Sequence, residues 1–328
     1  MHMSDALLST PVALAGAGLA AVLIGVAGQK IKNNDDSSLV PLMGVMGAFV
    51  FAAQMVNFSI PGTGSSGHIV GGVLLAALLG PWAGFLTLAS VLIIQCLIFS
   101  DGGLMALGWN IINMGAMTTL IAYPLIYKPI ARESTKPWRL AAASVAACVT
   151  GLELGAVMVT VETWLSGITA LPFLGFLGLM SAIHLAIGLG EGIATSAVLV
   201  FVAKSRPDLL VPASAAGHSG KKGLKKAVIW FAVAALVVAG GLSFLASSDP
   251  DGLEWSIGRL TGGVELETAG NAIAEGAENI RQTTALMPDY ESSFSGVVGA
   301  VMVVALVWAV CSVITSRRKK VTVKDEQA

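Results

Sequence analysis

The chain has 328 residues, 55% of them hydrophobic and 12% charged, with 38 glycines and a formal net charge of −1. No ordinary water-soluble domain has this balance, so the composition predicts an all-α, polytopic transmembrane helix bundle. It excludes nucleic-acid binding, because the basic residues flank apolar runs and form no patch of their own. The three cysteines lie far apart in apolar runs, which excludes a disulfide framework.

The first two residues, Met1 and His2, can chelate a metal without another side chain. The terminal amine, the His2 backbone nitrogen once deprotonated, and the His2 ring Nδ1 can together occupy three positions around one ion. A planar nitrogen set suits Ni(II) or Cu(II) better than Zn(II), which prefers a tetrahedral site. Because many chains begin Met-His by chance or as a cloning scar, this interpretation needs support from elsewhere in the sequence.

The start of the chain is not that of a cleaved signal peptide. Such a peptide begins with basic residues, whereas the stretch from Met1 to Asp5 has no Lys or Arg. The first basic residues follow the first apolar run instead. We therefore expect a first span that is retained in the mature protein, together with His2.

Nine apolar runs are candidates for membrane crossing, which takes about 20 residues. Charged clusters and Gly or Pro breaks bound them near 8–28, 39–58, 68–80, 82–99, 107–128, 139–164, 174–203, 227–246 and 294–315. The third run is short, and only Gly80-Pro81-Trp82 separates it from the fourth. If these two runs formed one re-entrant element, the orientation of everything after them would be inverted.

The distribution of basic residues tests this count, because cytoplasmic loops are enriched in Lys and Arg. With nine spans and the amino terminus outside, all but two of the 19 basic residues face the cytoplasm. The two exceptions, Arg259 and Arg281, lie in a loop from about 247 to 293 that also carries nine acidic residues. An eight-span chain breaks this pattern. We therefore predict nine spans, an outer amino terminus and a cytoplasmic carboxyl terminus.

Four segments follow from this layout. The sequence predicts a seven-helix core, a polar cytoplasmic linker, a two-span hairpin with an acidic outer loop, and a basic-then-mixed cytoplasmic tail, at residues 1–206, 207–226, 227–316 and 317–328 respectively. No sequence repeat relates the core to the hairpin.

His68 lies in the segment NFSIPGTGSSGHIVGG, at the start of the third run. The predicted topology places it at the outer end of that run, on the same side as the amino terminus. On its own, a histidine in a Gly- and Ser-containing loop at a membrane interface does not indicate a function. Two independently placed nitrogen sources on one face instead predict a shared metal site formed by Met1, His2 and His68.

Amide and carboxyl side chains cluster near the same outer face. They lie near the outer end of the second span and around the turn between the fourth and fifth spans, and they are Gln54, Asn57, Gln95, Asp101, Asn110 and Asn113. Such groups can orient the histidine rings and the amino terminus. They can equally form hydrogen bonds between helices, which is common in membrane bundles. The sequence leaves both interpretations open.

His184 and Glu191 lie seven residues apart in SAIHLAIGLGEGIATS and therefore share one helix face. Ionisable groups at membrane depth are costly unless they are paired or hydrated. A proton or ion relay is one interpretation of the pair. A packed polar seam, in which the groups satisfy each other, is the interpretation that we favour.

Several catalytic motifs are absent. The sequence has no phosphate loop, although GHSGKK resembles the end of one, and it has no H-E-x-x-H motif or nucleophile elbow. We therefore expect a protein that is not an enzyme and that does not hydrolyse nucleotides by the phosphate-loop route.

Six motifs in order resemble the CbiM/NikM family, the substrate-binding membrane components of energy-coupling-factor transporters for cobalt and nickel. They are MHMSDALLS, AFVFAAQMVNFSIPG, SGHIVGG, GPW, QCLIFSDGGLMALGWNIINMG and HLAIGLGEG, within residues 1–206. The segment DPDGLEW at 249–255 resembles the PDGLE signature of the small NikN-type component. The whole chain thus resembles a NikMN-type fusion.

This resemblance implies a seven-helix fold whose extra first helix delivers the amino terminus into a metal pocket. It implies metal ligation by the Met1 amine, the backbone and ring nitrogens of His2, and His68. It also implies two separate partners, a transmembrane coupling protein and an ABC-type ATPase, in the cytoplasmic membrane of a prokaryote. Relatives more often begin M-H-I-P-D-G, so the turn after His2 differs here, while the metal-bearing positions are unchanged.

We therefore expect uptake of Ni(II) or, as a close second, Co(II), carried as substrate with no bound organic cofactor. Copper would satisfy the same donors. The rival interpretation is an ion-coupled secondary transporter in which His184 and Glu191 form the relay. A non-transporting assembly or sensor protein is a third alternative, for which loss of His68 would leave metal uptake intact.

Overall fold

The computed structural model describes residues 1–34, 36, 38–132, 134–210, 221–263, 272–290 and 294–325. Parts of the predicted linker, outer loop and tail, at 211–220, 264–271, 291–293 and 326–328, lie outside the described residues. The described chain is almost entirely helical, with one two-stranded sheet. The predicted all-α transmembrane bundle is thereby confirmed, and the protein is a multi-pass membrane protein.

The first half of the core places two long helices beside shorter elements. In chain order the elements are η1 (Asp5–Leu7), α1 (Thr10–Lys32), α2 (Leu39–Gln54), β1 (Phe58–Ile60), β2 (Ser65–Gly67), α3 (Gly72–Leu79) and α4 (Pro81–Phe99). β1 and β2 pair as an antiparallel hairpin in which Phe58 lies opposite Gly67. This hairpin connects α2 to the segment that carries His68.

The second half of the core ends with two long helices that pack along each other. It comprises α5 (Leu107–Asn110), the continuous helix η2 (Ile111–Tyr127), α6 (Lys128–Ala131), α7 (Pro137–Ser166) and α8 (Phe173–Ser205), followed by η3 (Pro207–Leu209). Pro137 at the first turn of α7 suits a helix start, where no backbone N–H bond is lost.

The carboxyl-terminal part adds four α-helices to the core. It comprises α9 (Lys221–Gly240), η4 (Leu242–Leu245), α10 (Gly252–Thr261), α11 (Ala272–Thr284), η5 (Pro288–Tyr290) and α12 (Ser295–Asp325). Both α9 and α12 contact α2, and α12 also contacts α1 and α4. A Cβ at Gly299 of α12 would stand 2.0 Å from the ring of Phe51, so the two helices can approach this closely only with glycine there. The hairpin is therefore packed into the bundle.

Helices occupy all nine predicted positions, but not all are full-length spans. Within the described residues, five helices are long and apolar enough to cross a membrane, namely α1, α4, α7, α8 and the 295–314 part of α12. α2 and the 228–240 part of α9 are shorter apolar helices. α3 has only eight residues and a length of about 12 Å. It cannot cross a bilayer alone, so the predicted third span differs from a regular helix.

The reason lies at the two ends of α3. Gly71 and Gly80 flank it with φ angles of 79° and 83°, a left-handed conformation that glycine adopts without strain. Residues 68–71 before it have no regular secondary structure. This segment crosses part of the bundle as a buried, unwound chain and brings His68 inside.

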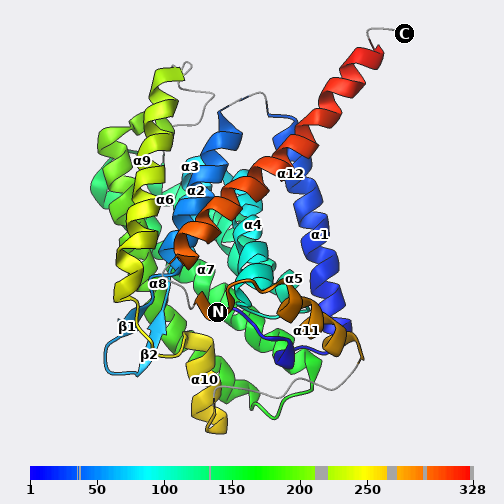
Figure 1. The fold of residues 1–328 in the computed structure, drawn as a ribbon. Coiled ribbons are helices and arrows are strands. Elements are labelled where there is room, and N and C mark those ends of the chain that lie inside the picture. Colours follow the sequence, from blue (N-terminus) through cyan, green and yellow to red (C-terminus); the bar gives the residue numbers. More distant parts are fainter. Residues whose placement is uncertain are drawn as a thin grey trace.

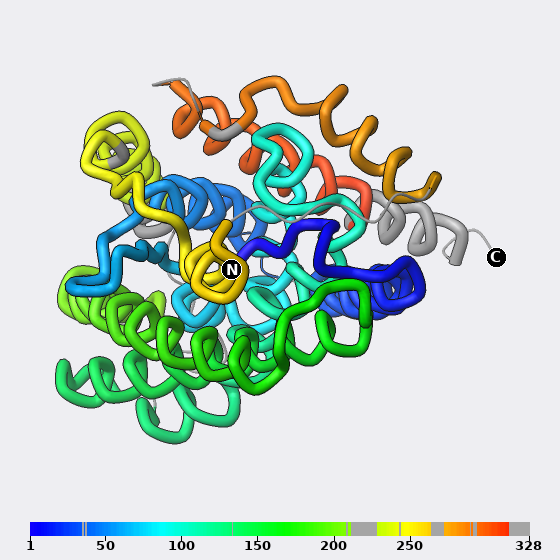
Figure 2. Tube along the Cα trace, turned by 90° about the horizontal axis from the view of Figure 1, so that it is seen from below, coloured from blue at the N-terminus to red at the C-terminus, as the bar shows by residue number. Residues whose placement is uncertain are grey.

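Different segments of the chain lie at the two ends of the bundle. Figure 1 shows the amino terminus, the β-hairpin, α10 and α11 at one end, and the far end of α12 at the other. Viewed from below, α10 and the amino terminus lie side by side (Figure 2). The predicted outer loop thus covers the end of the core at which the chain begins.

Candidate metal centre

The amino terminus is held in an extended conformation by α5 and the preceding turn. Asn110 receives a hydrogen bond from the Met3 backbone N–H at 2.8 Å and donates one to the Met3 carbonyl at 3.2 Å. The Gly103 N–H donates to the same carbonyl at 2.8 Å. Asp5 accepts from the Ala106 N–H at 3.0 Å. These bonds set the position of the first two residues relative to the core.

The Met1 amine forms an ion pair with Asp251 of the carboxyl-terminal hairpin, at 2.5 Å. Asp251 is also the N-cap of α10, where its other oxygen accepts from the Leu253 and Glu254 N–H groups at 2.8 Å each. Burial alone would raise the pKa of this carboxyl, but the positive amine and the hydrogen bonds outweigh it and hold the pKa below its usual range. Asp251 is therefore a fixed negative charge beside the amine.

Asp251 reaches this position because the chain next to it binds the β-hairpin. The Ser66 N–H donates to the Pro250 carbonyl at 2.8 Å, and the Ser66 hydroxyl donates to the Asp249 carbonyl at 2.7 Å. The Trp255 indole donates to the Thr63 carbonyl at 3.0 Å. The PDGLE segment is thus docked directly on the loop that precedes His68.

Gly252 allows α10 to rest on α8. A Cβ at this position would lie 2.9 Å from Ile187 Cδ1, 3.1 Å from Ile183 Cγ2 and 3.2 Å from His184 Cε1. Any side chain here would push the start of α10 away from the core, and Asp251 with it.

We expect Gly252→Ala to destabilise the protein by about 1–3 kcal/mol, because the added methyl overpacks this contact. Thermal unfolding in detergent measures the effect as a lower Tm. Gly276→Ala is the control, since a Cβ there would meet nothing within 4 Å. Equal Tm values for the two variants would contradict the close packing described here.

The His2 ring lies between Asp101 and Gln95. Its Nδ1 is 3.2 Å from Asp101 Oδ1 and its Nε2 is 3.3 Å from Gln95 Oε1. Burial lowers the pKa of His2 below its ordinary value, although Asp101 opposes the shift. The other Asp101 oxygen accepts from the Tyr290 hydroxyl at 2.7 Å. The hairpin therefore reaches the terminal residues at a second point.

The His68 ring stacks on the His2 ring, with centroids 5.3 Å apart and planes 24° from parallel. Its Nδ1 donates to the Ile69 carbonyl at 3.0 Å, because a carbonyl can only accept. Nε2 then carries the lone pair, which is the state in which an imidazole binds a metal. His68 is 9% exposed.

Two side chains form hydrogen bonds with the backbone of the unwound segment that carries His68. Glu191, mid-way along α8, accepts from the Val70 and Gly71 N–H groups at 2.8 and 2.9 Å. Gln54 donates to the Val70 carbonyl at 2.8 Å and accepts from Gln95 at 2.8 Å. Irregular backbone at membrane depth is tolerated only where such partners exist. These side chains therefore position His68.

Some of the predicted site residues lie together around the amino terminus, and others do not. Met1, His2 and His68 converge, and Gln54, Gln95, Asp101 and Asn110 bind the segments that carry them. Asn113 donates to Glu162 at 2.8 Å and contacts the Met3 sulfur at 3.8 Å. Asn57 offers its carbonyl to Ser247 and lies away from the terminus.

His184 and Glu191 share a buried face of α8 but have different partners. The His184 ring bonds the Met180 carbonyl, while both Glu191 oxygens bond the unwound segment. No hydrogen bond among the described residues joins the two. Glu191 thus supports His68, a role that the relay and seam interpretations both missed.

Asp251 and Tyr290 were also missed by sequence reasoning. The sequence contains a local signal for Asp251, since Asp251 and Glu254 form a capping box at the start of α10. That signal predicts the helix start but not the amine 250 residues away.

In the described part of the chain, no group of three His, Cys, Asp or Glu side chains could hold a metal ion. The amine of Met1 and the backbone nitrogen of His2 are further possible donors, and they lie next to His68.

Comparisons with known proteins match both parts of the chain. Residues 2–209 match the family model described as the cobalt uptake substrate-specific transmembrane region, and residues 225–316 match the PDGLE domain. The fused nickel transport protein NikMN of Rhodobacter capsulatus is 31% identical over 84% of this chain and 80% of its own length. A protein of Archaeoglobus fulgidus named as a fused nickel transport protein, NikMN, is 34% identical over 94% of this chain and 97% of its own.

A crystal structure of a transition metal transporter superposes on the core. It has a TM-score of 0.55 and 28% identity, and the match covers 62% of this chain and 93% of that one. The two domain matches and the full-length relatives have the same order of parts. The chain therefore belongs to the CbiM family of cobalt-uptake substrate-specific transmembrane proteins, in the form that is fused to a PDGLE domain.

Proposed function

We propose that this protein captures Ni(II) outside the cell, as the metal-binding component of an ATP-driven energy-coupling-factor importer. The cargo ion would be held by the Met1 amine, the backbone and ring nitrogens of His2, and His68 Nε2. The observation that carries this proposal is the convergence of the terminal amine with two stacked, buried imidazole rings. Relatives named as nickel transport proteins support nickel as the cargo.

Carboxylates hold the ligands in the structure described here. The amine is bound to Asp251, and His2 Nδ1 faces Asp101. On loading, the ion would replace both contacts. A divalent ion bound to one deprotonated backbone nitrogen leaves a net charge of +1 in a buried place, and the Asp251 charge offsets it.

The coupling protein, which lies with this chain in the lipid bilayer, and the ATPase are proposed as separate partners. The CbiM-type relatives support a multi-component transport system. No phosphate loop occurs in this chain. Cobalt remains the second candidate cargo, because a relative in Geobacter sulfurreducens is named cobalt transport protein CbiM. The secondary-transporter alternative gains no support, since both Glu191 oxygens are bound to the backbone.

We expect His68→Ala to weaken nickel binding by at least tenfold, because it removes one of four nitrogen donors. Isothermal titration of the purified protein with Ni(II), Co(II) and Cu(II) measures the loss and ranks the metals. Tyr123→Phe, in η2 away from the terminus, is the control. Wild-type nickel affinity in His68→Ala would show that the proposed site is wrong.

A further inference from the structure

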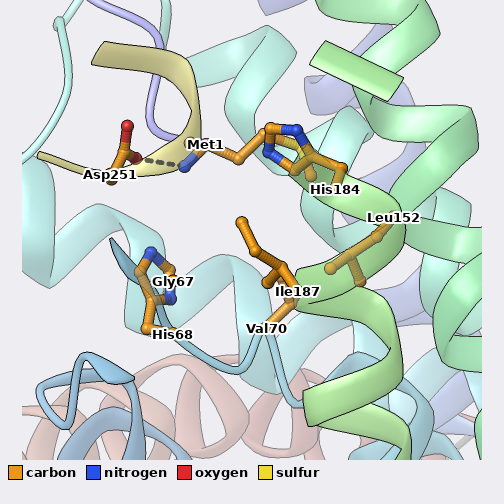
Figure 3. A pocket seen from close by; sticks show the side chains of 9 residues that line it. Met1, Gly67, His68, Val70, Leu152, His184, Ile187 and Asp251 are labelled. Carbon is orange, nitrogen blue, oxygen red and sulfur yellow. Dashed lines mark hydrogen bonds and ion pairs between the residues drawn. The ribbon is translucent and has the colours of Figure 1, made fainter. Parts of the chain in front are cut away.

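His184 lines the same small cavity as Met1, His68 and Asp251, but it has no part in the proposed nitrogen set. Figure 3 shows Asp251, Met1 and His184 along one side of this cavity, and His68, Val70 and Ile187 along the other. The His184 side chain is 1% exposed. Its Nε2 has no hydrogen-bond partner among the described residues.

The state of the His184 ring follows from its other nitrogen. Nδ1 is 2.8 Å from the Met180 carbonyl, and a carbonyl only accepts, so Nδ1 carries the hydrogen. Nε2 then has a free lone pair. Metal-binding histidines commonly donate their second N–H to a backbone carbonyl in this way. His68 has the same arrangement with Ile69.

A buried nitrogen without a partner costs about 1–3 kcal/mol, which an apolar side chain would avoid. The cavity beside it has a free volume of about 10 Å³, close to what one water-sized particle needs. Leu152 and Ile187 close it with apolar groups. The ring that bears the unpartnered Nε2 therefore lines a space with room for about one particle of the size of water.

The Asp251 carboxylate places a negative charge at the same cavity. A Cβ on Gly252, the next residue, would stand 3.2 Å from His184 Cε1, so the start of α10 lies directly against the ring. The cavity thus has a neutral nitrogen donor and a carboxylate on its wall. Ni(II) and Co(II) accept both ligand types.

We propose that His184 Nε2 and the Asp251 carboxylate form a second coordination position, which the cargo ion takes when it leaves the amino-terminal nitrogens. This inference rests on the proposed function. Only ligand exchange is involved, since the ion passes from one set of lone pairs to another. α8 carries His184, and Glu191 on the same helix holds the segment of His68. Movement of α8 would therefore displace His184 and the segment that carries His68 together.

A cysteine substitution, which supplies a thiolate, tests whether the side chain at position 184 binds the metal directly. In His68→Ala/His184→Cys, purified and loaded with Ni(II) or Co(II), we expect a thiolate-to-metal charge-transfer band that His68→Ala alone lacks. His68→Ala/Leu185→Cys is the matched control, because Leu185 is the next residue on α8 and is 48% exposed. A band that appears in the double variant with His184→Cys, and not in the control, supports the proposal. Absence of the band, or equal bands in both double variants, overturns it.

Transport tests the role of the second position. His184→Asn keeps an N–H for the Met180 carbonyl but lacks Nε2. In cells that express the whole transporter, we expect its nickel uptake to fall at least tenfold, while the purified variant binds nickel within threefold of wild type. Uptake within twofold of wild type, or loss of equilibrium binding, overturns the second position. Failure of the proposed function is distinct, because it appears as wild-type binding in His68→Ala.

Discussion

Insertion of three alanines between Met1 and His2 is expected to lower the nickel affinity by about 100-fold or more, or about 2.7 kcal/mol. The amine would no longer be adjacent to the His2 backbone nitrogen, and it would lie too far along the chain to share fused chelate rings with the His2 ring. The extra residues also move the amine by up to about 10 Å, away from Asp251. Isothermal titration with Ni(II) and the absorption spectrum of the bound metal measure both consequences.

The matched control for this insertion is a set of three alanines added after Ala328. This addition lengthens the chain equally without touching the candidate metal centre, and we expect the protein to bind nickel as the wild type does. Thermal unfolding shows whether the amino-terminal insertion leaves the bundle intact. An inserted protein that binds nickel with wild-type affinity and spectrum would show that the terminal amine is not a ligand.

Asp251→Asn is expected to weaken nickel binding by about 10-fold to 100-fold. Asparagine keeps an oxygen for the Leu253 and Glu254 N–H groups, so α10 retains its cap. What it removes is the negative charge beside the amine, which offsets the charge of the bound ion. It also removes the ion pair of the metal-free form, so we expect stability to fall by about 2 kcal/mol.

Asp249→Asn provides the control, because Asp249 is an aspartate of the same loop whose carboxylate accepts from the Ser59 and Ser247 hydroxyls at the exposed rim. Titration of both variants with Ni(II) at several salt concentrations compares a buried charge with an exposed one, which salt screens. Equal affinities of the two variants would show that Asp251 serves only as a helix cap.

Asp251 gives the PDGLE domain a direct contact with the candidate metal centre. It comes from the hairpin, yet it holds the terminal amine of the core. Tyr290, from the other end of the same loop, bonds the carboxylate that faces His2. The hairpin thus contacts the metal centre through both ends of its outer loop.

Much of the fold could be predicted because it depends on local properties of the chain. Apolar length sets where a helix can span the membrane, and the basic flanks set its direction. The same patterns place Met1 and His68 at one end of the bundle, where the structure stacks the His2 and His68 rings. The sequence therefore predicted that these residues would lie together, while their binding of a metal stays a prediction.

The partners of these residues depended on tertiary structure. A glutamate in an apolar helix signals a buried polar group, but only packing of α8 on the unwound segment shows that Glu191 binds Val70 and Gly71. The sequence also could not show that α3 is a half-length helix, since left-handed glycines at both ends limit it.

The sequence by itself determined the membrane bundle and pointed to the nitrogen donors that we propose, because these follow from hydropathy and residue type along the chain. Only the tertiary structure decided that Asp251 pairs with Met1 and that His184 faces the same cavity. Both facts depend on how α10 docks on α8, and that docking is set by shape at Gly252. Contacts between segments so far apart in the chain have no local pattern that could predict them.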